Sequence, residues 1–111
     1  MLNNIPTNIS IVEGNKGFKL HFTCQDSTGA VIDLTGTTIA FNAQLESDTS
    51  VQSTGNMVID NPTLGTCYYT VGANDFTIAG KYNAQIAVTY STAELITFGG
   101  IIINVLEKLP I

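Results

Sequence analysis

The feature that most constrains this chain is an alternation of apolar and polar residues between positions 82 and 90, with Ala87 as the one exception. Every second side chain there is apolar, the set being Tyr82, Ala84, Ile86, Val88 and Tyr90. Successive side chains of an extended strand point to opposite faces, so a period of two indicates a strand with one buried face. The same period recurs at residues 18–24, 38–45 and 66–71. No stretch follows the helical period, which predicts an all-β protein.

Turn-forming residues separate these segments at regular intervals, for example at residues 26–29, 33–36 and 91–93. About seven short strands punctuated in this way are typical of an immunoglobulin-like Greek-key β-sandwich. A chain of 111 residues also has the usual size of one domain. We therefore expect residues 1–111 to form a single immunoglobulin-like β-sandwich domain. Because tryptophan is absent, the antibody-type Cys, Trp, Cys pattern is missing and only the topology is predicted.

Three local patterns give sharper expectations. Residues 51–59 should form a weak strand pair or hairpin, with Ser53-Thr54-Gly55-Asn56 as its bend. The C-terminal stretch should either pair residues 95–98 with residues 100–106 or join them as one strand bent at the glycine pair between them. Tyr82 follows a crossing loop, in the position of the tyrosine corner of such sandwiches.

Charge disfavours one class of partner. The net charge is −5, with Lys16, Lys19, Lys81 and Lys108 as the cations, so little can neutralise a phosphate backbone and we expect no nucleic-acid binding.

The first residues lack the basic and apolar segments of a signal peptide, and the apolar run at residues 95–106 is too short to span a bilayer. We therefore expect a protein made in a cytoplasm, without membrane insertion.

Three segments follow one another in a distinctive order: VIDLTGTTIAFNAQL (31–45), LGTCYYTV (64–71) and IAGKYNAQIAVTY (78–90). Their order and spacing resemble the immunoglobulin-like N-terminal domain of the phage baseplate upper protein family. The shared elements are the Ile-Asp-Leu-Thr-Gly segment before a strand, the Gly-x-x-x-Tyr strand, and the Ala-Gly-x-Tyr segment that opens the long strand.

The resemblance implies a non-enzymatic bacteriophage structural protein, an assembly or adaptor module of the baseplate, tail or neck. It also implies a virion location, other phage structural proteins as partners, and a homo-oligomer or multi-copy assembly. Members of the family continue into a fibre or receptor-binding segment, whereas this chain stops at residues 108–111. We therefore expect either a piece of a longer protein or a stand-alone relative.

No motif for catalysis, nucleotide binding or cofactor binding is present, and we expect no enzyme activity, cofactor or metal. His21 is the only histidine, hence the only candidate histidine base, and it lies opposite the apolar face of its strand. The aspartates fall in predicted turns, where this residue commonly accepts backbone hydrogen bonds: Asp26, Asp33, Asp48, Asp60 and Asp75. A calcium site between two loops remains a minor alternative, although no D-x-D-x-D-G spacing is present.

The two cysteines, Cys24 and Cys67, allow one disulfide bond. In a reducing compartment two inward-facing cysteines are usually small core residues, so free thiols are favoured over the bonded pair. Together with one histidine they do not make a zinc site.

The C-terminal block is the strongest candidate for an interaction surface. If Ile101, Ile103 and Val105 face the core, the residues between them point outward, and a strand that is apolar on both faces needs cover on both. We expect a subunit contact formed by Ile102, Leu106, Leu109 and Ile111. The alternative is that the tail folds back over its own sheet.

A second class of function is a carbohydrate-binding or adhesive surface module. Such modules present exposed aromatic rings, and the only plausible platforms here are Tyr68 and Tyr90.

Overall fold

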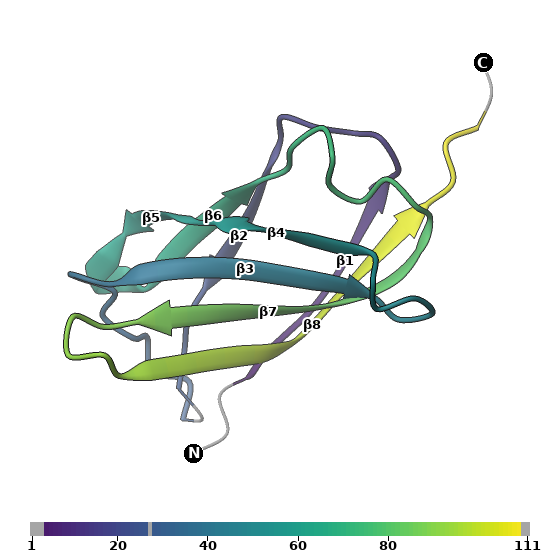
Figure 1. The fold of residues 1–111 in the computed structure, drawn as a ribbon. Helices are drawn as coiled ribbons and strands as arrows, with labels where there is room; N and C mark the ends of the chain where they lie inside the picture. Colours follow the sequence, from purple (N-terminus) through teal and green to yellow (C-terminus); the bar gives the residue numbers. More distant parts are fainter. Residues whose placement is uncertain (1–3, 27, 110–111) are drawn as a thin grey trace.

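Two β-sheets face each other in the structure, a computed structural model that describes residues 4–26 and 28–109, with side chains described from residue 8 onward (Figure 1). The larger sheet has the strand order β1-β8-β7-β3-β4, and the smaller sheet has the order β2-β6-β5. β1 pairs with β8 in parallel, and the other pairs are antiparallel. The elements are β1 (Asn4–Val12), β2 (Lys19–Thr23), β3 (Thr38–Leu45), β4 (Gln52–Asn56), β5 (Val58–Asn61), η1 (Pro62–Leu64), β6 (Thr66–Thr70), β7 (Gly80–Thr89) and β8 (Leu95–Leu106).

The connections between the sheets define the topology. The chain passes from one sheet to the other between β1 and β2, β2 and β3, β4 and β5, and β6 and β7. This is the Greek-key arrangement of an immunoglobulin-like sandwich, with β2-β6-β5 as one sheet and β8-β7-β3 at the centre of the other. The predicted fold class is therefore confirmed.

Inward side chains of both sheets form one apolar core. The ring of Phe41 on β3 stacks on Tyr69 of β6, with 4.5 Å between centroids, and so joins the two sheets. Tyr82 on β7 is fully buried and meets Phe76 edge to face at 5.1 Å. Its hydroxyl donates to the carbonyl oxygen of Ile78 at 2.8 Å, which confirms the expected tyrosine corner.

The C-terminal stretch forms one bent strand, the second of the two arrangements expected from its sequence. β8 pairs with β7 along its length, and the register shifts between Ala84 and Ile86. Gln85 therefore lies opposite the glycine pair, and Gly100 has a φ of 81°, which glycine adopts without strain. The bulge keeps apolar side chains on the core face on both sides of the bend.

The expected hairpin over residues 51–59 is wrong. β4 pairs with β3, whereas β5 pairs with β6 in the opposite sheet. The reason lies at Gly55, which passes directly under Tyr69: a β-carbon there would be 2.9 Å from Cε1 of that ring. The residues read as a bend are therefore extended strand, and the chain crosses between the sheets at Met57, whose N–H donates to the carbonyl of Ile39 at 2.8 Å.

β1 was not expected from the sequence. Its partner strand is β8, for example with Ile11 opposite Val105. Such pairing over a long sequence separation leaves little local signal. β1 forms one edge of the larger sheet, next to the C-terminal strand β8.

Candidate docking surfaces

The outer face of β8 carries two of the residues that are predicted to form a subunit contact, Ile102 and Leu106. Ile101, Ile103 and Val105 are buried in the core, as the alternation predicts. Ile102 points the other way and is half-buried, between the registered neighbours Asn83 of β7 and Asn8 of β1. It is thus an apolar residue between two polar neighbours.

The end of β8 is more exposed than its middle. Leu106 has 52% of its surface exposed and lies opposite Val12, the half-buried last residue of β1. Beyond the strand the chain leads away from the sheets (Figure 1), and the backbone N–H of Lys108 donates to Oε1 of Glu13 at 3.2 Å. Leu109 is 77% exposed.

We call Val12, Ile102, Leu106 and Leu109 the C-terminal apolar rim. Of the four predicted contact residues, Ile102, Leu106 and Leu109 belong to it, whereas Ile111 lies outside the described residues. Val12 was not predicted, because its position beside Leu106 depends on the unpredicted strand β1.

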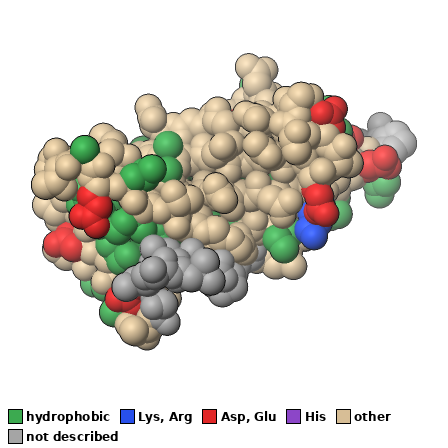
Figure 2. Space-filling model, turned by 60° about the horizontal axis from the view of Figure 1, so that its bottom comes forward, with side chains coloured by type: hydrophobic (Ala, Val, Ile, Leu, Met, Phe, Trp, Pro, Cys, Tyr) green, Lys and Arg blue, Asp and Glu red, His purple; other side chains and the backbone are tan. Residues whose placement is uncertain are grey.

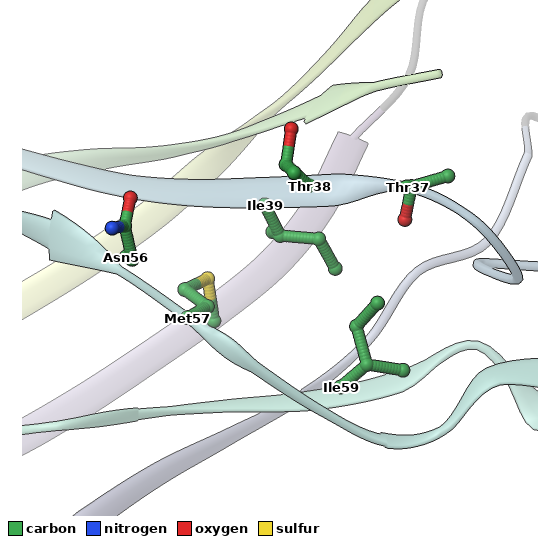
Figure 3. Close-up of a pocket in the computed structure, with 6 residues that line it drawn as sticks. All are labelled: Thr37, Thr38, Ile39, Asn56, Met57 and Ile59. Atoms are coloured by element: carbon green, nitrogen blue, oxygen red, sulfur yellow. The ribbon is translucent and has the colours of Figure 1, made fainter. Parts of the chain in front are cut away.

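A slot opens where the chain crosses from β4 to β5. Ile39, Met57 and Ile59 converge in it, while Thr38 and Asn56 point to the other side of the larger sheet (Figure 3). The slot has a volume of about 330 Å³. Its floor is largely buried, with Ile39 and Met57 exposing 3% and 8% of their surface, so it is suited to an apolar side chain.

A second hollow lies on the outer face of the larger sheet. It is lined by four amide side chains, has a volume of about 140 Å³, and involves Asn42 and Gln44 of β3 and Asn83 and Gln85 of β7. Asn42 is paired with Gln85, and Gln44 with Asn83. The alternation shows these residues facing outward, but only the pairing of β3 with β7 brings them together.

The two tyrosines considered as a ligand platform lie on different sheets. Tyr68 is half-buried on the outer face of β6, with Nζ of Lys19 4.6 Å from its ring centroid and the His21 ring 5.5 Å away. Tyr90 follows β7 and packs against the core, and its hydroxyl donates to the carbonyl of Asp33 at 3.4 Å. Burial raises the pKa of Tyr90 above its ordinary value.

The two cysteines are free, buried thiols. A hydrogen bond to Cys24 and burial both raise the pKa of Cys67, which disfavours its nucleophilic thiolate form. Cys67 lies on β6 and not on β7, so the pair does not occupy the positions of the immunoglobulin disulfide. Both side chains therefore act as core residues.

The described part of the chain contains no group of three or more metal-ligating side chains. Within the same part, no helix has the length and apolar character needed to cross a bilayer.

Asp26, Asp33 and Asp48 serve as turn-forming acceptors, as predicted. Asp75 also lies in a turn, where it accepts from the N–H of Gly72 at 2.8 Å and from the hydroxyl of Tyr69 at 2.6 Å. Asp60, in contrast, lies within β5 and not in a turn.

Comparison with known proteins assigns the chain to a family. The model of the BppU N-terminal domain, the domain that begins phage baseplate upper proteins, matches residues 2–109. The chain belongs to the BppU N-terminal domain family. The predicted resemblance is therefore confirmed, and the chain is a phage baseplate domain.

Other comparisons add less. Among solved structures, one match is "Drosophila OTK, extracellular domains 3-5", with 19% identity and a TM-score of 0.38. The alignment covers 98% of this chain and 35% of that one, and a similarity at this level carries no argument about function. No curated protein matches the sequence.

Proposed function

We propose that this BppU N-terminal domain is a non-enzymatic adaptor, which holds other phage structural proteins in the baseplate of the virion. The family match over residues 2–109 is the observation that carries the proposal. In this function residues 1–111 act as one docking domain, present in several copies.

The C-terminal apolar rim is the surface we assign to the subunit contact. Leu106 and Leu109 are more than half exposed, and Ile102 adds a half-buried apolar side chain on the same strand as Leu106. Burial of such a side chain contributes roughly 1.5 to 3 kcal/mol, so a few of them suffice to hold a subunit that is also held by its neighbours. The partner is a structural protein that offers a complementary apolar surface.

The titratable groups support a role without catalysis. His21 is exposed and lies against the ring of Tyr68, beside Lys19. The turn aspartates are held by the hydrogen bonds of their own turns. Each group thus has a structural partner that accounts for its position.

The test replaces Ile102 and Leu106 by aspartate in one variant. The chain is co-expressed with the structural proteins encoded beside its gene, and sedimentation velocity measures the size of the purified complex. Wild-type chain should sediment as a defined assembly, whereas I102D/L106D should sediment as a monomer with an unchanged circular dichroism spectrum. Two buried carboxylates without partners oppose any apolar contact.

The matched control is T89D/T97D, which adds the same two charges on exposed positions at the opposite end of the same sheet. It should assemble like the wild type. Normal assembly of I102D/L106D, or global unfolding of that variant, would contradict the assignment of the contact to the rim.

A further inference from the structure

The amide-lined hollow has a chemistry that the adaptor function does not use. Each primary amide offers two N–H donors and one carbonyl acceptor. Neighbouring amides on this face are already bonded: Gln52 Nε2 donates to the carbonyl of Thr49 at 3.2 Å, and Asn104 donates to Asn8 at 2.6 Å. Within the described residues, the four amides of the hollow make no such side-chain bond. Their hydrogen-bonding capacity faces solvent.

The arrangement of the four amides is regular. Asn42 lies opposite Gln85 and Gln44 lies opposite Asn83 on adjacent antiparallel strands. Side chains directly opposite each other on one face are about 5 Å apart at their β-carbons. The hollow therefore presents two amide pairs in parallel, each able to donate and accept on the same ligand.

The surroundings of the hollow are largely uncharged. Beside the pair of Asn42 and Gln85 the outward neighbours are Ala40 and Ala87, and those on β4 are Thr54 and Gln52. Figure 2, in which the bottom of Figure 1 comes forward, shows charged side chains toward the ends of this view, and mostly backbone and side chains that are neither apolar nor charged across its middle. At the other end the hollow borders on an ion pair: Lys81, two residues before Asn83, lies 3.2 Å from Glu46, two residues after Gln44. The two charges offset each other.

These features select the ligand class. An anionic ligand finds no free cation in the hollow, and a chain with a net charge of −5 repels it at long range. A cation finds no carboxylate there, and an apolar side chain finds only amide groups in the lining. A neutral ligand with many hydroxyl groups can use donors and acceptors together.

We propose that the hollow formed by Asn42, Gln44, Asn83 and Gln85 binds a neutral glycan, with its hydroxyl groups seated between the two amide pairs. A few exposed hydrogen bonds give weak binding, with a Kd on the order of 1 mM for one domain. Several copies in one assembly multiply such weak contacts by avidity. Binding by the isolated domain does not require the rim, so it is tested separately from the adaptor function.

The test is an NMR titration of the ¹⁵N-labelled chain with maltotriose, cellotriose and tri-N-acetylchitotriose, each up to about 20 mM, well above the expected Kd. The side-chain NH₂ signals of the four hollow amides should shift with at least one of these probes. An oligogalacturonate of the same length, which is anionic, should shift them much less.

Two double variants complete the test. N42A/Q85A and Q44A/N83A each remove one amide pair at outward positions, and each should weaken binding by about tenfold. Either variant suffices if the other fails to fold, as its backbone spectrum would show. The control Q25A/N74A removes two exposed amides elsewhere and should bind like the wild type.

Absence of shifts with all three neutral probes would overturn the proposal. So would shifts centred on Tyr68, which would indicate an aromatic platform on the other sheet. Concentration-dependent broadening of the hollow signals without sugar would also overturn it, since the face would then be a contact between copies of the chain.

Discussion

At the scale of single residues, three aspartates build three turns in the same way. Oδ1 of Asp26 accepts from the backbone N–H and the hydroxyl of Thr28, at 2.9 and 2.5 Å. Asp33 does the same with Thr35, and Asp48 with Ser50. Hydrogen bonds to the ionised carboxylate lower the pKa of all three aspartates below their ordinary value of 3.8. The turns are therefore held by charged groups.

Acid should weaken these turns. A carboxyl whose pKa is lower in the folded state contributes stability above its unfolded pKa, and this stability is lost as the pH falls through the folded pKa. Urea unfolding between about pH 5 and about pH 2 should show a falling free energy of unfolding. The triple variant D26N/D33N/D48N keeps the acceptor oxygens but does not titrate, so its loss over the same range should be smaller. An equal loss in both proteins would contradict this origin of the acid sensitivity.

A comparison of two glycines distinguishes the cost of a left-handed backbone from the cost of a steric clash. Gly36 has a φ of 72° in open space, whereas Gly65 has a φ of 68° and faces two backbone carbonyls. A β-carbon at Gly65 would be 2.8 Å from the oxygen of Ile32 and 2.9 Å from the oxygen of Cys24. We expect G36A to cost about 1 to 2 kcal/mol, the ordinary penalty of a left-handed alanine.

G65A should cost distinctly more, by about 1 kcal/mol or above, because packed backbone has to move. The displacement would also strain the bond from the N–H of Cys24 to the carbonyl of Gly65, 2.8 Å long. Urea denaturation of the two variants measures the difference. Equal costs would show that the loop relaxes freely around position 65.

At the scale of elements, alternation predicted the strands that carry a regular apolar face. β3 spans the same residues, 38–45, as the expected strand, and β7 and β8 follow their patterns closely. The pattern fails where another part of the chain decides the conformation. Ser53 is buried and its hydroxyl accepts from the N–H of Phe76 at 3.0 Å, so the serine and glycine that suggested a bend instead line the interior of β4.

The same distinction applies to the candidate sites: a local pattern predicts one of them, and pairing between distant residues decides the others. The outward direction of Ile102 and Leu106 depends only on the period of β8, and the sequence predicted it. The amide hollow depends on the register of β3 against β7, and the slot at Met57 depends on the crossing between sheets. Register and crossing are properties of pairing between distant residues, so no local pattern contains them.

At the scale of the whole molecule, the apolar rim lies on an acidic protein. The described chain measures 47 × 25 × 23 Å and carries a net charge of −5. Glu13 and Glu107 lie close to the rim, Glu13 through its bond to the N–H of Lys108. Copies held side by side in an assembly therefore repel one another, and the apolar contact has to overcome this repulsion.

Salt should thus strengthen the assembly. Raising the ionic strength from about 0.1 M to about 1 M shortens the screening length from about 10 Å to about 3 Å, which weakens repulsion between copies but not apolar burial. Sedimentation velocity of the co-expressed complex, diluted in parallel at both salt concentrations, should show less dissociation at high salt. The same comparison with L106D should show dissociation at both concentrations, because screening does not restore the lost apolar surface. An assembly that falls apart at high salt would instead be held by ion pairs, and the rim would then not be its main contact.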